Sequence, residues 1–218
     1  MKNLHHFLKK PEGKLITGLS AVILLLMAYY FYATNNTPAA PKGELIISET
    51  DHVRGALDGT VTLVEFGDFQ CPACASYEPI VQQVLKDNPK NLKFVFKHFP
   101  LYQIHRNAIL SAKASEAAGL QGTFWEMHDL LYLNQKEWAE NLKSREVILS
   151  YASKLNLDVK KFSQDLDNKS IEDKIMAEYK EGVNLGVQGT PTFFLNGKKI
   201  NNPRSIEEFN KLIKESVK

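Results

Sequence analysis

Residues Val61–Cys74 read VTLVEFGDFQCPAC and carry the strongest signals in the sequence. The first half, Val61–Gly67, is rich in β-branched and aromatic residues and apolar on both faces, which is typical of a buried central strand. After a short turn, apolar residues recur at helical spacing: Ile80, Val81, Val84 and Leu85. We therefore predict a strand, a turn and a helix that begins at Cys71 and runs to about Lys86.

The sequence contains two cysteines, Cys71 and Cys74, and both lie in this segment. A disulfide that stabilises a fold closes a long loop and so removes unfolded-state entropy, whereas this pair closes almost none. Redox chemistry and metal binding are the interpretations that remain. A tetrahedral zinc site would need further ligands, for which there are only scattered histidines such as His98 and His105. We therefore favour a redox pair that uses no metal and no other cofactor.

Their positions in the helix give the two sulfurs different roles. One helical turn separates the Cα atoms, which falls within the range of about 4.4–6.8 Å that a disulfide tolerates. Cys71 lies in the first turn, where unsatisfied N–H groups and the helix dipole favour a thiolate over a thiol. We predict that Cys71 is the nucleophile and that Cys74 resolves mixed disulfides. Pro72 suits the first turn because its missing N–H would be unsatisfied there.

The rest of the pattern predicts two halves of one sheet separated by helices. Strands are expected at Glu44–Ser48 (an edge), Leu92–Phe99, Thr192–Leu195 and Lys198–Ile200, the last two joined by an Asn196-Gly197 turn. Helices are expected at 104–119, from a Thr123–Glu126 capping box, at 145–155, at 159–166, from Ser170 to Gly186, and after a Ser205–Glu208 cap. This order predicts an α/β fold with a helical insertion at about 104–186.

The N-terminus carries a candidate membrane anchor. Residues 15–33 read LITGLSAVILLLMAYYFYA and contain no charge, which matches the roughly 20 apolar residues that span a bilayer. Lys9, Lys10 and Lys14 precede it, so the positive-inside bias predicts a cytoplasmic tail at 1–14 and, beyond a linker at 34–43, an extracytoplasmic domain. The expected location is a bacterial cell membrane, crossed once by a signal-anchor. A cleaved signal peptide is the alternative, although no good cleavage site follows the apolar run.

The CPAC segment resembles the DsbA-type branch of the thioredoxin superfamily. Two further features carry the resemblance: Pro79, which is expected to kink the helix, and Gly189-Thr190-Pro191-Thr192 more than 100 residues later. The resemblance covers about 44–218 and implies a thioredoxin-like fold that exchanges thiols and disulfides with extracytoplasmic proteins. It also implies that Pro191 is a cis-proline beside the cysteine pair and that the Thr190 backbone pairs with the substrate.

Glu65, six positions before Cys71, completes the predicted site. Strand alternation puts it on the face of Val61 and Leu63, and the family that the chain resembles carries a buried acid at this place. Burial would raise the pKa of the carboxyl and let it relay protons to or from Cys74. A purely structural buried acid is the alternative. Lys93 or Lys97 in the next strand is a candidate partner of the carboxylate.

The direction of electron flow is the least determined part of the prediction. An oxidising compartment favours a protein that introduces disulfides and is reoxidised by a DsbB-like membrane oxidase. Pro72-Ala73, however, lacks the histidine with which strongly oxidising relatives stabilise the thiolate. A reductase or isomerase kept reduced by a membrane electron donor is the alternative, and a peptide-binding chaperone without turnover is an alternative of another class. The net charge of +2, with no basic cluster beyond the N-terminus, predicts no nucleic-acid partner.

Overall fold

The structure is a computed structural model of the 218-residue chain and describes residues 22–32 and 43–217. The chain divides into two compact units, residues 1–40 and 41–218. In the first unit, residues 22–32 are helical and exposed. No helix among the residues that the structure describes has both the length and the apolar character needed to cross a bilayer. The predicted tail, the ends of the predicted anchor and nearly all of the linker lie outside the described residues, so the anchor stays a prediction.

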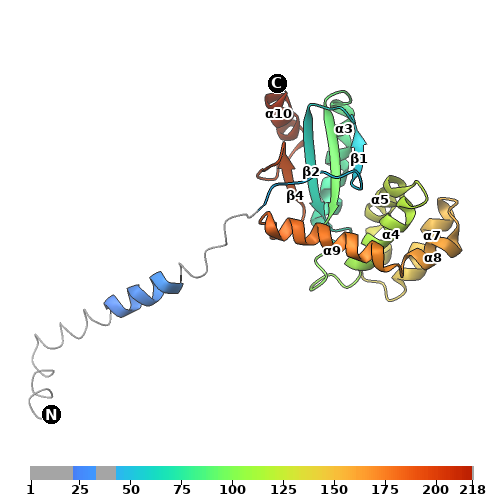
Figure 1. Ribbon diagram of the computed structural model, residues 1–218, viewed down its shortest axis with the longest axis horizontal. Helices are drawn as coiled ribbons and strands as arrows, with labels where there is room; N and C mark the ends of the chain where they lie inside the picture. The colour runs from blue at the N-terminus through green and yellow to red at the C-terminus, as the bar shows by residue number, and fades with distance from the viewer. Residues whose placement is uncertain (1–21, 33–42, 218) are drawn as a thin grey trace, which may run out of the picture. The chain divides into compact units, whose positions relative to one another are not determined.

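A mixed sheet of five strands forms the centre of the second unit (Figure 1). The strands are β1 (His52–Gly55), β2 (Val61–Gly67), β3 (Leu92–His98), β4 (Thr192–Leu195) and β5 (Lys198–Lys199), in the spatial order β1-β3-β2-β4-β5. β2 and β3 are parallel and central, and every other neighbouring pair is antiparallel. β2 is therefore hydrogen-bonded on both sides, which agrees with its nearly continuous apolar sequence.

Helices cover both faces of the sheet. α3 (Pro72–Asp87) and α10 (Ile206–Ser216) pack together on one face, where Val61 and Leu63 point into the larger hydrophobic core. α9 (Lys169–Asn184) crosses the other face, over Phe66 and Phe99. Gly182 makes this close approach possible, because a Cβ atom there would lie 2.7 Å from the Phe99 ring. The predicted thioredoxin-like sandwich is thereby confirmed.

The predicted helical insertion lies between β3 and β4. It comprises α4 (Ala108–Gly119), α5 (Phe124–Leu133), α6 (Gln135–Trp138), α7 (Ser144–Lys154) and α8 (Val159–Asp165), and α9 leads back to the sheet (Figure 1). Its own interior is filled by side chains with no exposed area, among them Trp138, Tyr151 and Phe162. These large aromatic side chains give the insertion a close-packed core of its own.

The predicted edge strand at Glu44–Ser48 is wrong. These residues have no strand structure, and the edge is formed by His52–Gly55, which pairs with Lys93–Phe96. Ile46 and Ile47 of the apolar run are exposed, and the Ile46 N–H donates to the Glu181 carboxylate at 3.0 Å instead of to a strand. An apolar run alone therefore did not locate the edge.

Several predicted helix starts are also corrected. The first helix of the insertion begins at Ala108, not at 104. The Thr123 side chain caps no helix, because its hydroxyl donates back to the Ala118 carbonyl. α9 is capped by Asn168, whose side chain accepts from the Ser170 N–H at 3.0 Å, and not by Ser170. The Ser205 cap of α10 is confirmed, and so is the turn at Asn196-Gly197, where both residues have positive φ.

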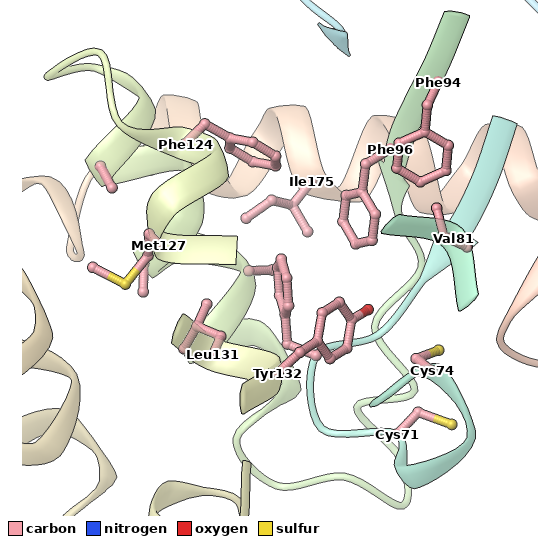
Figure 2. Packing of buried hydrophobic residues seen from close by; sticks show 14 of the residues in the cluster. Cys71, Cys74, Val81, Phe94, Phe96, Phe124, Met127, Leu131, Tyr132 and Ile175 are labelled. Atoms are coloured by element: carbon pink, nitrogen blue, oxygen red, sulfur yellow. The ribbon is translucent and has the colours of Figure 1, made fainter. Parts of the chain in front are cut away.

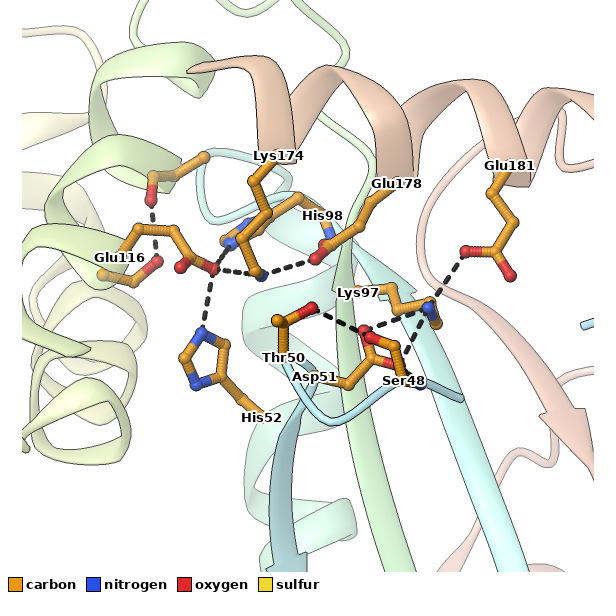
Figure 3. Close-up of polar contacts among 12 residues, drawn as sticks. Ser48, Thr50, Asp51, His52, Lys97, His98, Glu116, Lys174, Glu178 and Glu181 are labelled. Carbon is orange, nitrogen blue, oxygen red and sulfur yellow. Dashed lines mark hydrogen bonds and ion pairs between the residues drawn. The ribbon is translucent and has the colours of Figure 1, made fainter. Parts of the chain in front are cut away.

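A buried network of ion pairs joins the sheet to the insertion (Figure 3). Lys97 on β3 contacts Asp51 at 3.0 Å and Glu181 on α9 at 2.9 Å. Beside it, one oxygen of Glu116 on α4 accepts from three side chains: Lys174 at 2.7 Å and His52 and His98 at 2.9 Å each. We call these residues, together with Glu178, which pairs with Lys174, the β3–α9 ion network.

Candidate active site

The two cysteines lie where α3 meets the turn that follows β2 (Figure 2). Cys71 has extended backbone angles (φ −71°, ψ 121°) and is the N-cap, and Pro72 is the first helical residue. Cys74 lies one turn into the helix. Both side chains are free thiols in the structure, and Cys71 is 7% exposed whereas Cys74 is 1% exposed. An incoming sulfur therefore reaches Cys71 first.

The Cys71 environment favours the thiolate. Its pKa is lowered to about 5, because the Cys74 thiol, the Thr190 side chain and the N–H groups of Cys74 and Ala73 donate hydrogen bonds to the sulfur. These donors outweigh the burial of the sulfur, which alone would raise the pKa. At neutral pH Cys71 is therefore a thiolate, even though position 73 holds an alanine and not a histidine that could stabilise the charge.

Cys74 is shifted the opposite way. Burial raises its pKa well above the usual thiol value, and the hydrogen bond that it gives to Cys71 and the charges of Glu65 and Cys71 raise it further. Cys74 therefore holds its proton at neutral pH. The pair thus consists of one thiolate and one thiol, and the roles of Cys71 as nucleophile and Cys74 as resolving group stay a prediction.

The loop before β4 lies directly against Cys71. The Thr190–Pro191 peptide bond is cis, and in the thiol form Cys71 Sγ donates to the Thr190 carbonyl oxygen at 3.4 Å. The buried Thr190 hydroxyl has no other hydrogen-bond partner among the described residues, so its influence falls on this sulfur. The Pro191 carbonyl accepts from the Asn202 side chain at 2.7 Å. Two segments separated by more than 100 residues in the sequence thereby meet at one sulfur.

Glu65 is buried beneath the cysteine pair, on the same face of β2 as Val61 and Leu63. Burial raises the pKa of its carboxyl well above the usual value, and repulsion from Glu78 and Cys71 adds to this. The expected lysine partner is not there. Lys97 points to the opposite face and pairs with Asp51 and Glu181, and no ion pair joins Lys93 to Glu65 in the described part of the chain. Burial without an ion-paired lysine among the described residues therefore favours the protonated form of Glu65, the form that a proton donor needs.

Sequence reasoning missed the residues that hold the active-site turn. The buried Asp68 carboxylate accepts from the Gln70 N–H at 2.8 Å, the Leu101 N–H at 2.9 Å and His105 Nδ1 at 2.6 Å. From α6, the Gln135 side chain donates to the Phe69 and Cys71 carbonyls at 2.7 and 3.0 Å. Asp68 lies within Val61–Cys74, the segment with the strongest sequence signals. No sequence pattern around Gln135 indicates its role, because Gln135 belongs to the insertion and contacts the turn only in the folded chain.

Among the residues that the structure describes, no group of three or more potential metal ligands includes Cys71 or Cys74. His98 Nε2 contacts Glu116 at 2.9 Å, and His105 Nδ1 contacts Asp68 at 2.6 Å. Among the described residues, three potential ligands do meet elsewhere: Glu78, His128 and Asp129. Arg54 already holds both Asp129 oxygens, at 3.0 and 2.9 Å, so that carboxylate is neutralised by an ion pair.

Proteins of known structure share this fold. A family model described as thioredoxin matches residues 47–215. The oxidised form of BdbD from Bacillus subtilis is 24% identical, with a TM-score of 0.68, and the match covers 82% of this chain and 98% of BdbD. The thiol-disulfide exchange protein α-DsbA2 from Wolbachia pipientis is 21% identical, with a TM-score of 0.67, over 77% of this chain and 88% of that one. At these identities the likeness establishes a DsbA-type fold.

Curated relatives of higher identity are longer proteins. Na⁺/H⁺ antiporter NhaA 1 of Salinispora arenicola is 44% identical over 160 residues, which are 73% of this chain and 24% of that protein. NhaA 3 of Salinispora tropica is 40% identical over 159 residues, again 73% and 24%. The chain spans about a quarter of the length of these relatives, so the ion transport in their names is not carried over to it.

Proposed function

The chain belongs to the thioredoxin family, and from that membership we propose that it is a thiol:disulfide oxidoreductase that introduces disulfide bonds into extracytoplasmic proteins through Cys71 and Cys74. The observation that carries the proposal is the pair of free thiols at the start of α3, with Cys71 against the Thr190 carbonyl at 3.4 Å; this environment lowers the pKa of Cys71 to about 5 and raises that of Cys74. A stabilised Cys71 thiolate is a good leaving group and favours the reduced pair, which makes the disulfide an oxidant.

The proposed reaction starts from the Cys71–Cys74 disulfide. A substrate thiolate attacks Cys71 Sγ, a mixed disulfide forms, and Cys74 leaves as a thiolate that takes up a proton. A second substrate thiolate then attacks the substrate sulfur of the mixed disulfide, and Cys71 leaves as its stabilised thiolate. The substrate loses two electrons and gains a disulfide, while the cysteine pair gains the two electrons and becomes the dithiol seen in the structure. In this scheme the Thr190–Pro191 loop positions the substrate backbone beside Cys71.

Location and redox partner are further parts of the proposal. The uncharged run at 15–33 and the lysines before it support an anchor that leaves the domain outside the cytoplasm. There a DsbB-like membrane oxidase would take the two electrons and restore the Cys71–Cys74 disulfide. An oxidising compartment is where a protein of this activity is useful.

The test combines the reaction with a trap. The oxidised protein is mixed with a reduced, unfolded protein whose own activity depends on its disulfides, and regain of that activity is followed. We expect turnover by the native protein and none by Cys71→Ser. The Cys74→Ser variant is mixed instead with the disulfide-bonded form of the substrate: its Cys71 thiolate attacks that disulfide, one substrate sulfur leaves as a thiolate, and the mixed disulfide accumulates because no Cys74 sulfur is present to release it. The redox state of the pair in cells is trapped in parallel by rapid acid quenching and alkylation.

The alternatives predict other results. A pair found mostly reduced in cells, with a potential below that of the glutathione couple, would assign the protein to disulfide reduction or isomerisation instead. A Cys71→Ser variant that keeps full activity would overturn exchange altogether and point to a peptide-binding chaperone.

A further inference from the structure

One side-chain hydrogen bond holds the loop that lies against Cys71. The Asn202 amide nitrogen, Nδ2, donates to the Pro191 carbonyl oxygen at 2.7 Å. The carbonyl of the preceding residue, Thr190, lies 3.4 Å from Cys71 Sγ. We propose that Asn202 is a positioning residue, which fixes the Thr190–Pro191 loop so that a substrate polypeptide binds along it beside Cys71. The inference rests on the proposed thiol–disulfide exchange and adds a residue that makes it favour polypeptide thiols over small thiols.

Asn202 is itself held on both sides along the chain. Before it, the Ile200 N–H donates to the Phe193 carbonyl at 3.0 Å, which extends the pairing of β4 with β5. After it, Pro203 is buried, and a residue that precedes a proline is restricted to extended backbone angles. Ser205 then caps α10 with its side chain. The Asn202 amide therefore reaches the loop from a segment that has little freedom to move.

The hydrogen bonds within the loop leave the Thr190 backbone available to a substrate. The Gly189 carbonyl accepts from the Thr192 hydroxyl at 2.7 Å, and the Pro191 carbonyl is occupied by Asn202. The Thr190 N–H has no hydrogen-bond partner among the described residues. The Thr190 carbonyl accepts from the Cys71 thiol, which has no proton to donate once Cys71 is in the disulfide. In the form that a substrate attacks, both backbone groups can therefore pair with an extended peptide.

Such pairing helps only a substrate that has a peptide backbone. Dithiothreitol contains no peptide group, so it attacks Cys71 without using the loop. A loop that is held in one geometry before the substrate arrives loses less conformational freedom on binding, and it places the substrate sulfur more accurately for attack. Asn202 should therefore increase the rate of exchange with polypeptides and leave the rate with small thiols nearly unchanged.

Asn202→Asp is the sharpest substitution for a test. The carboxylate has nearly the size of the amide but donates no hydrogen bond, and its oxygens would face the Pro191 carbonyl oxygen, so that two acceptors repel each other. Asn202→Ala removes the donor without this repulsion. The alanine variant gives the same comparison if the aspartate variant does not fold.

The experiment compares two reductants of the oxidised protein, a short peptide with two cysteines and dithiothreitol. In both reactions the reductant loses two electrons and forms its own disulfide, while the Cys71–Cys74 disulfide becomes the dithiol. Acid quenching and alkylation of the free thiols at successive times give a second-order rate constant for each reductant. Either Asn202 variant should lower the constant for the peptide by about tenfold and change the constant for dithiothreitol by less than about twofold.

Asn201→Asp is the matched control, because it makes the same change one residue away. Asn201 is exposed and lines the same cavity of about 710 Å³ as Asn202, but among the described residues it donates no hydrogen bond to the loop. Both of its rate constants should equal the native ones. A native peptide constant in both Asn202 variants would overturn the proposal. Equal losses of both constants would also overturn it, because a damaged cysteine pair or fold does not distinguish the two reductants. A native protein that reacts with neither reductant would instead contradict the proposed thiol exchange.

Discussion

The low pKa of Cys71 shows how much of a reactive sulfur is made by its immediate neighbours. Ala73 offers no side-chain donor, yet hydrogen bonds from Cys74, Thr190 and two backbone N–H groups lower the Cys71 pKa to about 5. The absence of a histidine therefore does not by itself remove the oxidising character that the sequence left open. In this protein the Cys71 thiolate is instead stabilised by groups at the start of α3 and by the Thr190–Pro191 loop.

Thr190→Val tests that source. Valine keeps the shape of threonine and removes the hydroxyl, and a hydrogen bond to a charged group contributes about 1.5 kcal/mol or more, which corresponds to about one pKa unit. We expect Thr190→Val to raise the midpoint of Cys71 alkylation against pH by about one unit relative to a reference that has the same residue at position 74, because the Cys74 thiol itself lowers the Cys71 pKa. The rate of iodoacetamide alkylation, measured on a Cys74→Ala background for both proteins, gives the difference directly.

Thr192→Val is the control for this change, because it is the same substitution two residues away. The Thr192 hydroxyl donates to the Gly189 carbonyl at 2.7 Å and does not face the sulfur. Its alkylation midpoint should stay at the native value. A Thr190→Val profile that coincides with the native one would show that the backbone N–H groups and Cys74 account for the thiolate without Thr190.

An element could be predicted from the sequence when the residues that specify it are adjacent in the chain. β2, α3 and the Asn196-Gly197 turn are specified by adjacent residues, so the apolar pattern, the helix start at Cys71 and the turn dipeptide located them within a residue or so. The same holds for the site residues Cys71, Cys74, Thr190, Pro191 and Glu65, which belong to two short motifs. The structure brings these residues together at the start of α3, and their roles in exchange stay a prediction.

Other features depend on tertiary contacts that no local pattern records. β1 is an edge because Val53 and its neighbours pair with β3 and because the Trp125 indole donates to the Val53 carbonyl at 3.0 Å. Lys97 was a plausible partner for Glu65 by proximity along β3, but its side chain lies on the α9 face. α6 is too short to give a periodic signal, although its Gln135 holds the active-site turn. Packing determined these elements.

Gln135→Ala measures how much the short helix α6 contributes. The substitution leaves the Phe69 and Cys71 carbonyls without the donor that serves both. We expect the free energy of unfolding to fall by about 1–2 kcal/mol, the cost of losing such hydrogen bonds. Urea denaturation of the reduced protein is the measurement. The neighbouring exposed Lys136→Ala should change the value by no more than about 0.5 kcal/mol, and equal effects of the two variants would contradict the structural role of Gln135.

The β3–α9 ion network connects the sheet to the insertion. Because its members are charged, we expect the free energy of unfolding of the domain to depend on pH. Burial alone would raise the Glu116 pKa, but hydrogen bonds from His52 and His98 and the charge of Lys174 hold it well below its usual range. A carboxyl whose folded pKa is depressed stabilises the fold at pH values above its unfolded pKa of about 4.3, and that stabilisation disappears as the pH falls below this value.

Glu116→Gln should therefore have two effects on the free energy of unfolding. At pH 7 it should be lower by about 3–5 kcal/mol, because Lys174 and the two histidines lose a buried anionic acceptor. Between about pH 5 and 3 its decline should be shallower than in the native protein, since the variant has one fewer carboxylate to protonate. Denaturant titrations at several pH values measure both quantities. Glu172→Gln removes an exposed carboxylate paired with Lys113 and should alter neither the pH 7 value nor the slope appreciably. If Glu116→Gln keeps the native slope, acid sensitivity arises elsewhere and the network joins the two parts of the domain by packing alone.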